Sequence, residues 1–145
     1  IDYFYNRIMK WYIAARFGLK EKVREIHGLL RKRGHEVLGD WTNHIPIKPY
    51  QKHTDLASDY SIEDVNSVKE CEVFCLLSDE AGTGMYVELG VAILSNMLQK
   101  KPDVYVIGEQ NTRSMFYFHP AVNRRATIDD VIAEVERGKL ESIET

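Results

Sequence analysis

Carboxylate side chains lie near the predicted ends of several strands, and Glu88 is the one whose surroundings most favour chemistry. It follows a continuous apolar run at residues 73–77 and a polar turn that contains Gly82 and Gly84. Such a turn lets the backbone approach a ligand, at the sheet edge where open α/β sheets bind ligands. Paired carboxylates there suit cleavage of a glycosidic bond, because one can attack the anomeric carbon while a protonated partner assists the leaving group. The candidate carboxylates are Asp40, Asp64, Asp79, Glu80 and Glu88.

Other catalytic signatures are absent from the sequence. The turn Gly82-Thr83-Gly84 lacks the third glycine of a dinucleotide fingerprint and follows the third predicted strand rather than the first. There is no Walker A lysine pattern and no nucleophile elbow. The five histidines are scattered without metal-ligand spacing, so we expect them to be surface or structural side chains. We therefore predict no metal ion and no cofactor.

The composition indicates one globular domain. The chain of 145 residues, 44% hydrophobic and 28% charged, is long enough for a single core. A formal net charge of -3 gives no electrostatic reason to expect a nucleic-acid polymer or a membrane as partner, and no apolar run could span a bilayer. Cys71 and Cys75 lie four residues apart on or beside one predicted strand, too far apart to bridge, so we expect free buried thiols in a cytoplasmic protein.

The domain is predicted to cover residues 9–138. Residues 1–8 contain charges and no continuous apolar core, so they do not resemble a signal peptide, and we treat them as an N-terminal extension before Met9. Gly138 is expected to stop the last helix, which leaves residues 139–145 as a polar tail.

Apolar runs and helical stripes alternate along the chain. Strands are predicted at residues 11–15, 35–39, 73–77, 104–107 and within 120–126. The helices between and after them are predicted to bury four stripes: Leu19, Val23, Ile26 and Leu30; Ile62, Val65 and Val68; Val87, Val91, Leu94 and Leu98; and Ile128, Val131, Ile132 and Val135. This alternation predicts an α/β three-layer sandwich with a five-stranded parallel sheet, of flavodoxin or Rossmann type.

The connection at residues 40–55 is polar and long for a compact domain. Connections of this length are usually functional or mobile. Because it follows a predicted strand, it should lie at the same sheet edge as Glu88 and could cover a substrate. A plain surface loop is the alternative.

Three features of the sequence resemble the nucleoside 2-deoxyribosyltransferase family, which includes the 2'-deoxynucleoside 5'-phosphate N-hydrolases and related nucleotide N-glycosidases. They are the segment Tyr12-Ile-Ala-Ala-Arg16-Phe17 at the first strand, Asp64 before the central strand, and Gly82-Thr-Gly-Met-Tyr-Val-Glu88-Leu-Gly90. The resemblance covers roughly residues 10–132. It implies cleavage or transfer at the N-glycosidic bond of a nucleoside or nucleotide, and a homo-oligomer, either a dimer or an assembly of dimers.

The resemblance also implies a role for each matching residue. Glu88 matches the nucleophile that attacks C1' of the sugar, and Tyr12 matches a tyrosine that hydrogen-bonds and orients that carboxylate. Asp64 matches an aspartate that could serve as the acid for the leaving base. The positions that match substrate-binding residues are Arg16, Phe17, Gly84, Met85 and Ser114, the last in a segment that reaches into the neighbouring subunit's site.

The sequence departs from the family pattern at two places. Many members have the nucleophile directly after the large residue that follows the second glycine, whereas Tyr86 and Val87 intervene here. Transferases also carry a base-recognising aspartate upstream of the glycines, and spacing does not decide between Asp79 and Glu80 for this role.

Structural roles compete with these functional ones. Glu88 could merely favour a helix N-terminus through the dipole, and Asp64 could belong to a capping box that begins at Ser61. Tyr12 could be a core aromatic residue, and Arg16 a surface cation. At the level of activity, transfer between bases, hydrolysis of a nucleoside 5'-monophosphate, and nucleotide binding without turnover all stay open.

Overall fold

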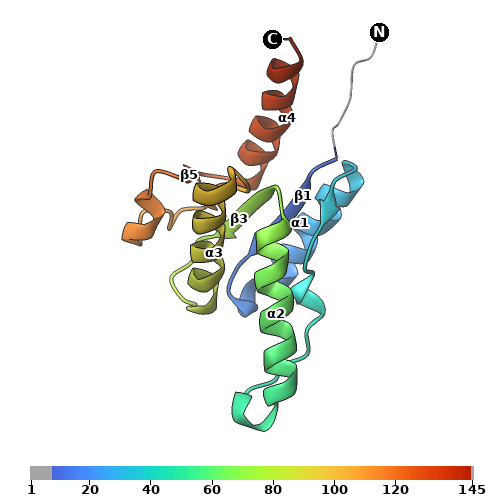
Figure 1. Cartoon of the computed structure of the whole chain (residues 1–145), viewed down its shortest axis with the longest axis vertical. Helices are drawn as coiled ribbons and strands as arrows, with labels where there is room; N and C mark the ends of the chain where they lie inside the picture. Colours follow the sequence, from blue (N-terminus) through green and yellow to red (C-terminus); the bar gives the residue numbers. More distant parts are fainter. Residues whose placement is uncertain (1–7, 145) are drawn as a thin grey trace.

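The structure, a computed structural model, describes residues 8–144, with side chains as far as residue 138. Most of the predicted extension and the side chains of the predicted tail lie outside this part of the chain. Five parallel strands form one sheet in the order β2-β1-β3-β4-β5 (Figure 1). The strands are β1 (Lys10–Ala14), β2 (Glu36–Val37), β3 (Val73–Leu77), β4 (Asp103–Ile107) and β5 (Val122–Arg125).

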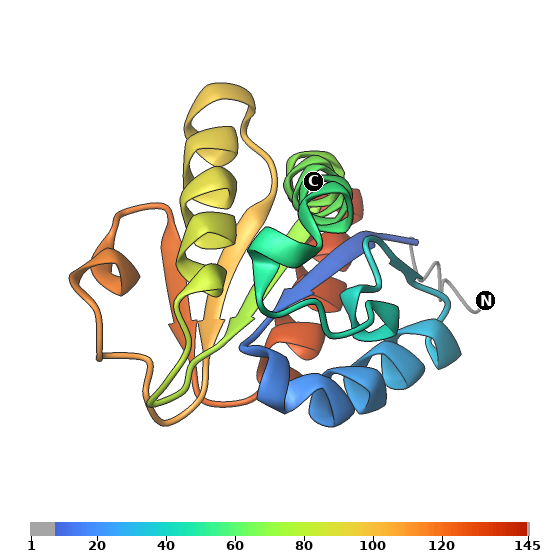
Figure 2. The same cartoon turned by 90° about the horizontal axis from the view of Figure 1, so that it is seen from below.

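Helices cover both faces of this sheet. The α-helices are α1 (Lys20–Lys32), α2 (Thr54–Glu70), α3 (Gly84–Gln99) and α4 (Ile128–Glu144). Short 3-10 segments lie in the connections: η1 (Phe17–Leu19), η2 (Trp41–Asn43), η3 (Tyr50–Lys52) and η4 (Met115–Phe118). Helices α2 and α3 lie on one face, and α1 and α4 on the other (Figure 2). The predicted three-layer α/β sandwich is therefore confirmed, with the flavodoxin-like strand order.

The central strands and two of the helices are built as the sequence predicts. All five residues of β3 are buried, as expected of a parallel strand covered on both faces. Helix α1 buries Val23, Ile26 and Leu30, and it is followed by Gly34 in the left-handed region at φ 87°. At the start of α4, the Asp130 N–H donates to Thr127 Oγ at 3.1 Å, so that the threonine caps the helix.

Helix α3 buries a different face from the predicted one. Val87, Leu94 and Leu98 are 63%, 54% and 77% exposed. The buried apolar side chains of α3 are instead Met85, Leu89, Ala92 and Ile93. The prediction was wrong because α3 is apolar around most of its circumference, so that two stripes with helical spacing were available.

Helices α2 and α4 also differ from their predictions. Helix α2 begins at Thr54, and of its predicted stripe only Val68 is fully buried, whereas Ile62 is 57% exposed. Helix α4 continues past Gly138 to Glu144. Glycine in a helix interior costs only about 1 kcal/mol relative to alanine, so it does not by itself end a helix.

The two cysteines are buried and free, as predicted. Within the described part of the chain, no helix has both the length and the apolar character that a membrane span requires.

Candidate active site

A cavity of about 790 Å³ opens at the carboxyl edge of the sheet, where the connections after β1 and β3 diverge. Open α/β sheets bind ligands at this switch point. Its walls come from the connections after β1, β2 and β3, from one face of α2 and from the start of α3. The lining side chains include Arg16, Phe17, Trp41, His44, Tyr60, Asp64, Met85 and Glu88.

Glu88 lies half-buried at the cavity, one turn into α3 rather than in its first turn. Burial raises the pKa of its carboxyl to about 8, and the negative charge of Asp64 raises it further. The nearby Tyr12 hydroxyl opposes this shift. Because a helix N-terminus would lower a carboxyl pKa, stabilisation by the helix dipole does not describe this environment.

Asp64 reaches the same cavity from the interior of α2. The capping-box interpretation is wrong, because α2 begins at Thr54, well before Ser61. Burial raises the pKa of Asp64 to about 6, while the nearby His44 lowers it. Its Oδ1 is buried without a hydrogen-bond partner among the described residues. A buried carboxyl oxygen without a hydrogen-bond partner lowers the stability of the fold. Such oxygens are typical of functional sites, where a ligand supplies the partner.

Tyr12 stands in β1 beneath these carboxyls. It is fully buried, and its ring stacks on Phe74 with 6.0 Å between the ring centroids. Burial and the charges of Glu88 and Asp64 raise its pKa well above the usual value, so it stays a neutral hydroxyl donor. The hydroxyl lies close enough to Glu88 to affect the pKa of that carboxyl, but no hydrogen bond with normal geometry is formed.

Gly39 packs closely against the Tyr12 ring. Its φ is +56°, and a Cβ atom at this position would lie 2.9 Å from the Tyr12 ring. A side chain here would therefore be strained and would press on the tyrosine.

Arg16 leaves β1 at the mouth of the cavity. Its Nε donates to Asp79 Oδ2, and this bond holds the pKa of Asp79 below its usual value. The guanidinium lies against Gly18, where an added Cβ atom would overlap with Nη1. Neither Asp79 nor Glu80 lines the cavity.

The remaining predicted binding residues divide into two groups. Phe17, Gly84 and Met85 line the cavity beside Glu88, despite the two extra residues in the glycine motif. Ser114 does not line it. Its hydroxyl instead accepts a hydrogen bond from the Phe116 N–H at 3.2 Å at the start of η4.

Sequence reasoning missed three cavity residues in or beside the long polar connection. The Trp41 ring centroid lies 6.3 Å from that of Phe17, and the rings of His44 and Tyr60 stack in parallel at 3.7 Å. The sequence predicts His44 only as a surface or structural residue, without a place at the site. A tryptophan in a polar connection was the available signal, because so large an apolar side chain usually packs against something.

This arrangement can run acid and nucleophile chemistry with two carboxyls. Each stands in a low-dielectric site that favours its neutral form, and their charges repel. One proton is therefore shared by the pair near neutral pH, and the higher pKa of Glu88 places it mainly on Glu88, with Asp64 as the carboxylate. Among the described residues, no group of three or more potential ligands is placed to hold a metal ion.

The raised pKa of Glu88 predicts a pH-dependent cost to stability. Between about pH 4.5 and 8 the folded state binds more protons than the unfolded state, so stability falls as the pH rises through this window. Glu88→Gln cannot ionise, and we expect it to be more stable than the parent protein by about 1–3 kcal/mol near pH 8. Near pH 5 the difference should largely vanish. Denaturant unfolding at both pH values measures this.

The exposed Glu80 provides the control for this experiment, since Glu80→Gln should change stability little at either pH. An equal stability difference between Glu88→Gln and the parent at both pH values would contradict a buried, proton-sharing Glu88.

The fold and the cavity together define a flavodoxin-like α/β protein with two carboxyls at its switch point. No protein-family model matches the sequence, and no curated protein does. Among solved structures, the chain is similar to the CMP N-glycosidase BcmB of Clostridium botulinum, with a TM-score of 0.53 and 15% sequence identity. The match covers 94% of this chain and 99% of the glycosidase. Such a match establishes the shared fold along nearly the whole domain.

Proposed function

We propose that this protein cleaves or transfers at the N-glycosidic bond of a nucleoside or nucleoside 5'-monophosphate, with Glu88 as the nucleophile. The observation that carries the proposal is the meeting of Glu88 and Asp64 in one cavity, from different helices, with raised pKa values. The motif around Glu88 resembles that of the nucleoside 2-deoxyribosyltransferase family. The structural similarity to a CMP N-glycosidase agrees with this reaction class.

In the proposed reaction, the less populated form of the pair reacts, in which Glu88 is ionised and the shared proton is on Asp64. Glu88 attacks C1' while Asp64 donates this proton to the departing base. The bond from C1' to the base nitrogen breaks, and an ester between Glu88 and the sugar forms. Water or a second base then attacks C1', and the bond from C1' to Glu88 breaks, which releases the carboxylate. The proton lost by the attacking water or base goes to Asp64. Tyr12 donates a hydrogen bond to Glu88 and holds its orientation. A carboxylate beneath the ring also stabilises the cationic transition state.

The cavity residues suit the rest of a nucleotide. Phe17 offers a ring to the base, and Gly84 and Met85 border the sugar beside Glu88. Among the described lining residues, the basic side chains are one arginine, Arg16, and one lysine, Lys48. Either could contact a 5'-phosphate. No cofactor takes part in this reaction.

The substrate test is an incubation of the protein with CMP, dCMP and dGMP, and with the corresponding nucleosides, with and without an acceptor base. Free base without an acceptor would identify a hydrolase, and exchange alone would identify a transferase. Tight binding without product after long incubation would support a nucleotide-binding module that does not turn over. Absence of both binding and product with every compound would contradict the proposal.

We also propose that the protein is a homo-oligomer, a dimer or an assembly of dimers, in the cytoplasm. An apolar surface on α3 and η4 supports this: it consists of Val87, Leu94, Met97, Leu98, Met115, Phe116 and Phe118, each more than half exposed. Exposed large apolar side chains in this number on two neighbouring segments are typical of a surface that packs against a partner. Ser114 lies at the start of η4, so a partner that packs here could receive it in its own cavity.

Leu94→Glu is therefore expected to dissociate the oligomer into monomers at micromolar concentration, because a charge would be buried in an apolar interface. Light scattering coupled to size exclusion measures this. The control is Lys32→Glu on the exposed side of α1, which should leave the assembly intact. A parent protein that is monomeric at these concentrations would contradict the proposal, and a monomeric Leu94→Glu with full activity would show that no partner residue completes the site.

A further inference from the structure

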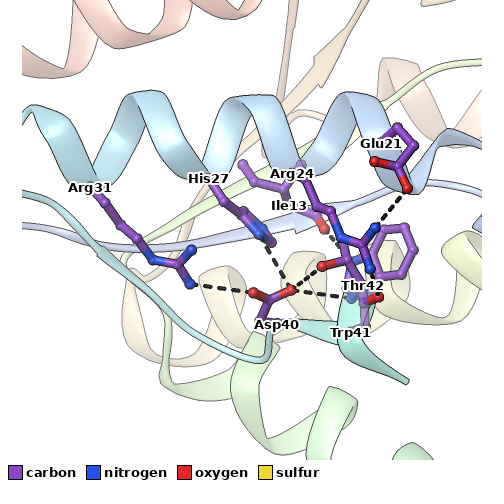
Figure 3. A network of polar contacts seen from close by, with 8 residues as sticks. All are labelled: Ile13, Glu21, Arg24, His27, Arg31, Asp40, Trp41 and Thr42. Atoms are coloured by element: carbon purple, nitrogen blue, oxygen red, sulfur yellow. Dashed lines mark hydrogen bonds and ion pairs between the residues drawn. The ribbon is translucent and has the colours of Figure 1, made fainter. Parts of the chain in front are cut away.

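Side chains of α1 contact the connection after β2 at residues 40–42 (Figure 3). Asp40 caps η2: its Oδ1 accepts from the Thr42 N–H at 3.2 Å and from the Thr42 hydroxyl. Arg31 Nη2 lies 3.4 Å from the other carboxylate oxygen, and His27 Nδ1 lies 3.5 Å from the first. One carboxylate thus joins α1 to the start and the middle residue of the η2 turn.

A second contact fixes the far side of the same turn. Arg24 Nη2 donates to the Thr42 carbonyl oxygen at 2.7 Å, and Arg24 is itself held by Glu21 at 2.6 Å. The residue between the two fixed positions is Trp41, whose indole N–H donates to the Ile13 carbonyl oxygen of β1 at 2.7 Å. Trp41 is consequently fixed through its backbone on both sides and through its ring.

The network keeps Asp40 charged. Burial raises the pKa of its carboxyl, but the Thr42 hydrogen bonds and the His27 and Arg31 contacts outweigh burial and hold the pKa below its usual value. Burial lowers the pKa of His27, which is 1% exposed, so that Asp40 faces a neutral imidazole near neutral pH. The carboxylate is therefore a permanent acceptor for the cap of η2.

Trp41 connects this network to the cavity. Its side chain is only 6% exposed, yet it lines the cavity next to Phe17. A rigid aromatic wall of this kind suits a planar base, because a ring that is already fixed loses no rotational freedom on binding. Neither the motifs around Glu88 nor the substrate-binding positions implied by the family resemblance include Asp40 or Trp41.

We infer that Asp40 is a positioning residue, which acts through the η2 turn to hold the Trp41 indole as the wall against which the nucleobase stacks. This inference rests on the proposed function, since it takes the ligand to be a nucleoside or nucleotide. Asp40 itself does not contact the substrate. Its effect is transmitted by the two backbone positions that flank Trp41.

The test measures ligand binding without turnover, in a Glu88→Ala background. CMP, dCMP and dGMP are titrated while tryptophan fluorescence is followed. A base that stacks on Trp41 should quench its fluorescence. The other tryptophan, Trp11, is buried in the core outside the cavity, so Trp41→Phe should remove this quenching. Asp40→Ala is expected to raise the dissociation constant about 10-fold or more. Asp40→Asn keeps an oxygen that can accept from Thr42, and it should restore binding to within about 3-fold of the parent value.

A destabilising change on α4 separates positioning from a general loss of stability. Glu136→Ala removes the ion pair with Arg33, which links α4 to the residue that follows α1, and neither residue lines the cavity. This variant should lower thermal stability with an unchanged dissociation constant. Equal weakening of binding by Asp40→Ala and Glu136→Ala, unweakened binding by Asp40→Ala, or full quenching in Trp41→Phe would each overturn the inference.

Failure of the inference can be told apart from failure of the proposed function. If the parent protein turns over a nucleoside or nucleotide but one of the three contradicting results above is found, the proposed function is supported and the role of Asp40 is refuted. If no probe is bound and none is turned over, both fall.

Discussion

Replacing Glu88 with alanine is expected to lower turnover by at least about 1,000-fold while leaving the fold intact. The carboxylate supplies the bond-forming atom in the proposed reaction, and no other described carboxylate lining the cavity stands beside the Tyr12 hydroxyl as Glu88 does. Water could replace it only as a poorly placed nucleophile. Base release by the parent and by Glu88→Ala, measured chromatographically at saturating substrate, gives the ratio directly.

Glu80→Ala is the matched control for this loss. Glu80 lies in the same connection after β3, but it is exposed and does not line the cavity, so its removal should leave turnover unchanged. Mass spectrometry of the parent protein after rapid acid quenching should show a sugar adduct on the peptide that contains Glu88. Wild-type rates in Glu88→Ala, on a substrate that the parent converts, would refute the nucleophile assignment.

The sequence predicts the sheet well because its signals are local. An apolar run covered on both faces defines β3, and its observed bounds are those expected. The stripe on α1 is equally clear, because charged residues occupy its other face and only one apolar face remains. Strand order and handedness then follow from general rules of α/β folds, and these bring the connections after β1 and β3 to one edge.

The orientation of α3 could not be predicted in the same way. Leu89 is buried and Leu94 is exposed, although both belong to apolar stripes with helical spacing. What decides between the stripes is the contact of α3 with β3 and α2, which sequence periodicity does not contain. The error is informative, because an apolar face left outside the fold indicates surface available to a partner.

The candidate site was partly predictable for a related reason. Arg16 follows the first strand in the sequence, and Asp64 and Glu88 lie on either side of the central strand. The structure places all three at one cavity. Trp41 and His44 lie in a connection without periodicity, and their positions depend on long-range contacts with α1 and α2. Only the three-dimensional arrangement shows that this connection forms aromatic walls.

Asp64→Asn is expected to lower turnover by about 100-fold or more, because the departing base would lose its proton donor. The loss should be smaller for substrates whose base leaves easily without protonation, and this difference separates an acid from a residue that only shapes the cavity. Asp59→Asn on the exposed side of α2 makes the same chemical change away from the cavity and should have little effect.

The pH dependence of the same variant tests the coupling between the two carboxyls. In the parent protein, activity requires one proton on the pair, so the rate should pass through a maximum between about pH 6 and 8. The acidic limb of the parent is the first proton loss of the pair, which cannot lie above the pKa of Glu88 beside a neutral neighbour. Asp64→Asn titrates with that single pKa, which burial keeps raised, so its acidic limb should lie at the same pH as in the parent or higher. The alkaline limb should disappear, since asparagine has no proton to lose. A profile of unchanged shape and reduced height would show that Asp64 does not titrate with Glu88, and the acid would then have to be sought elsewhere in the cavity.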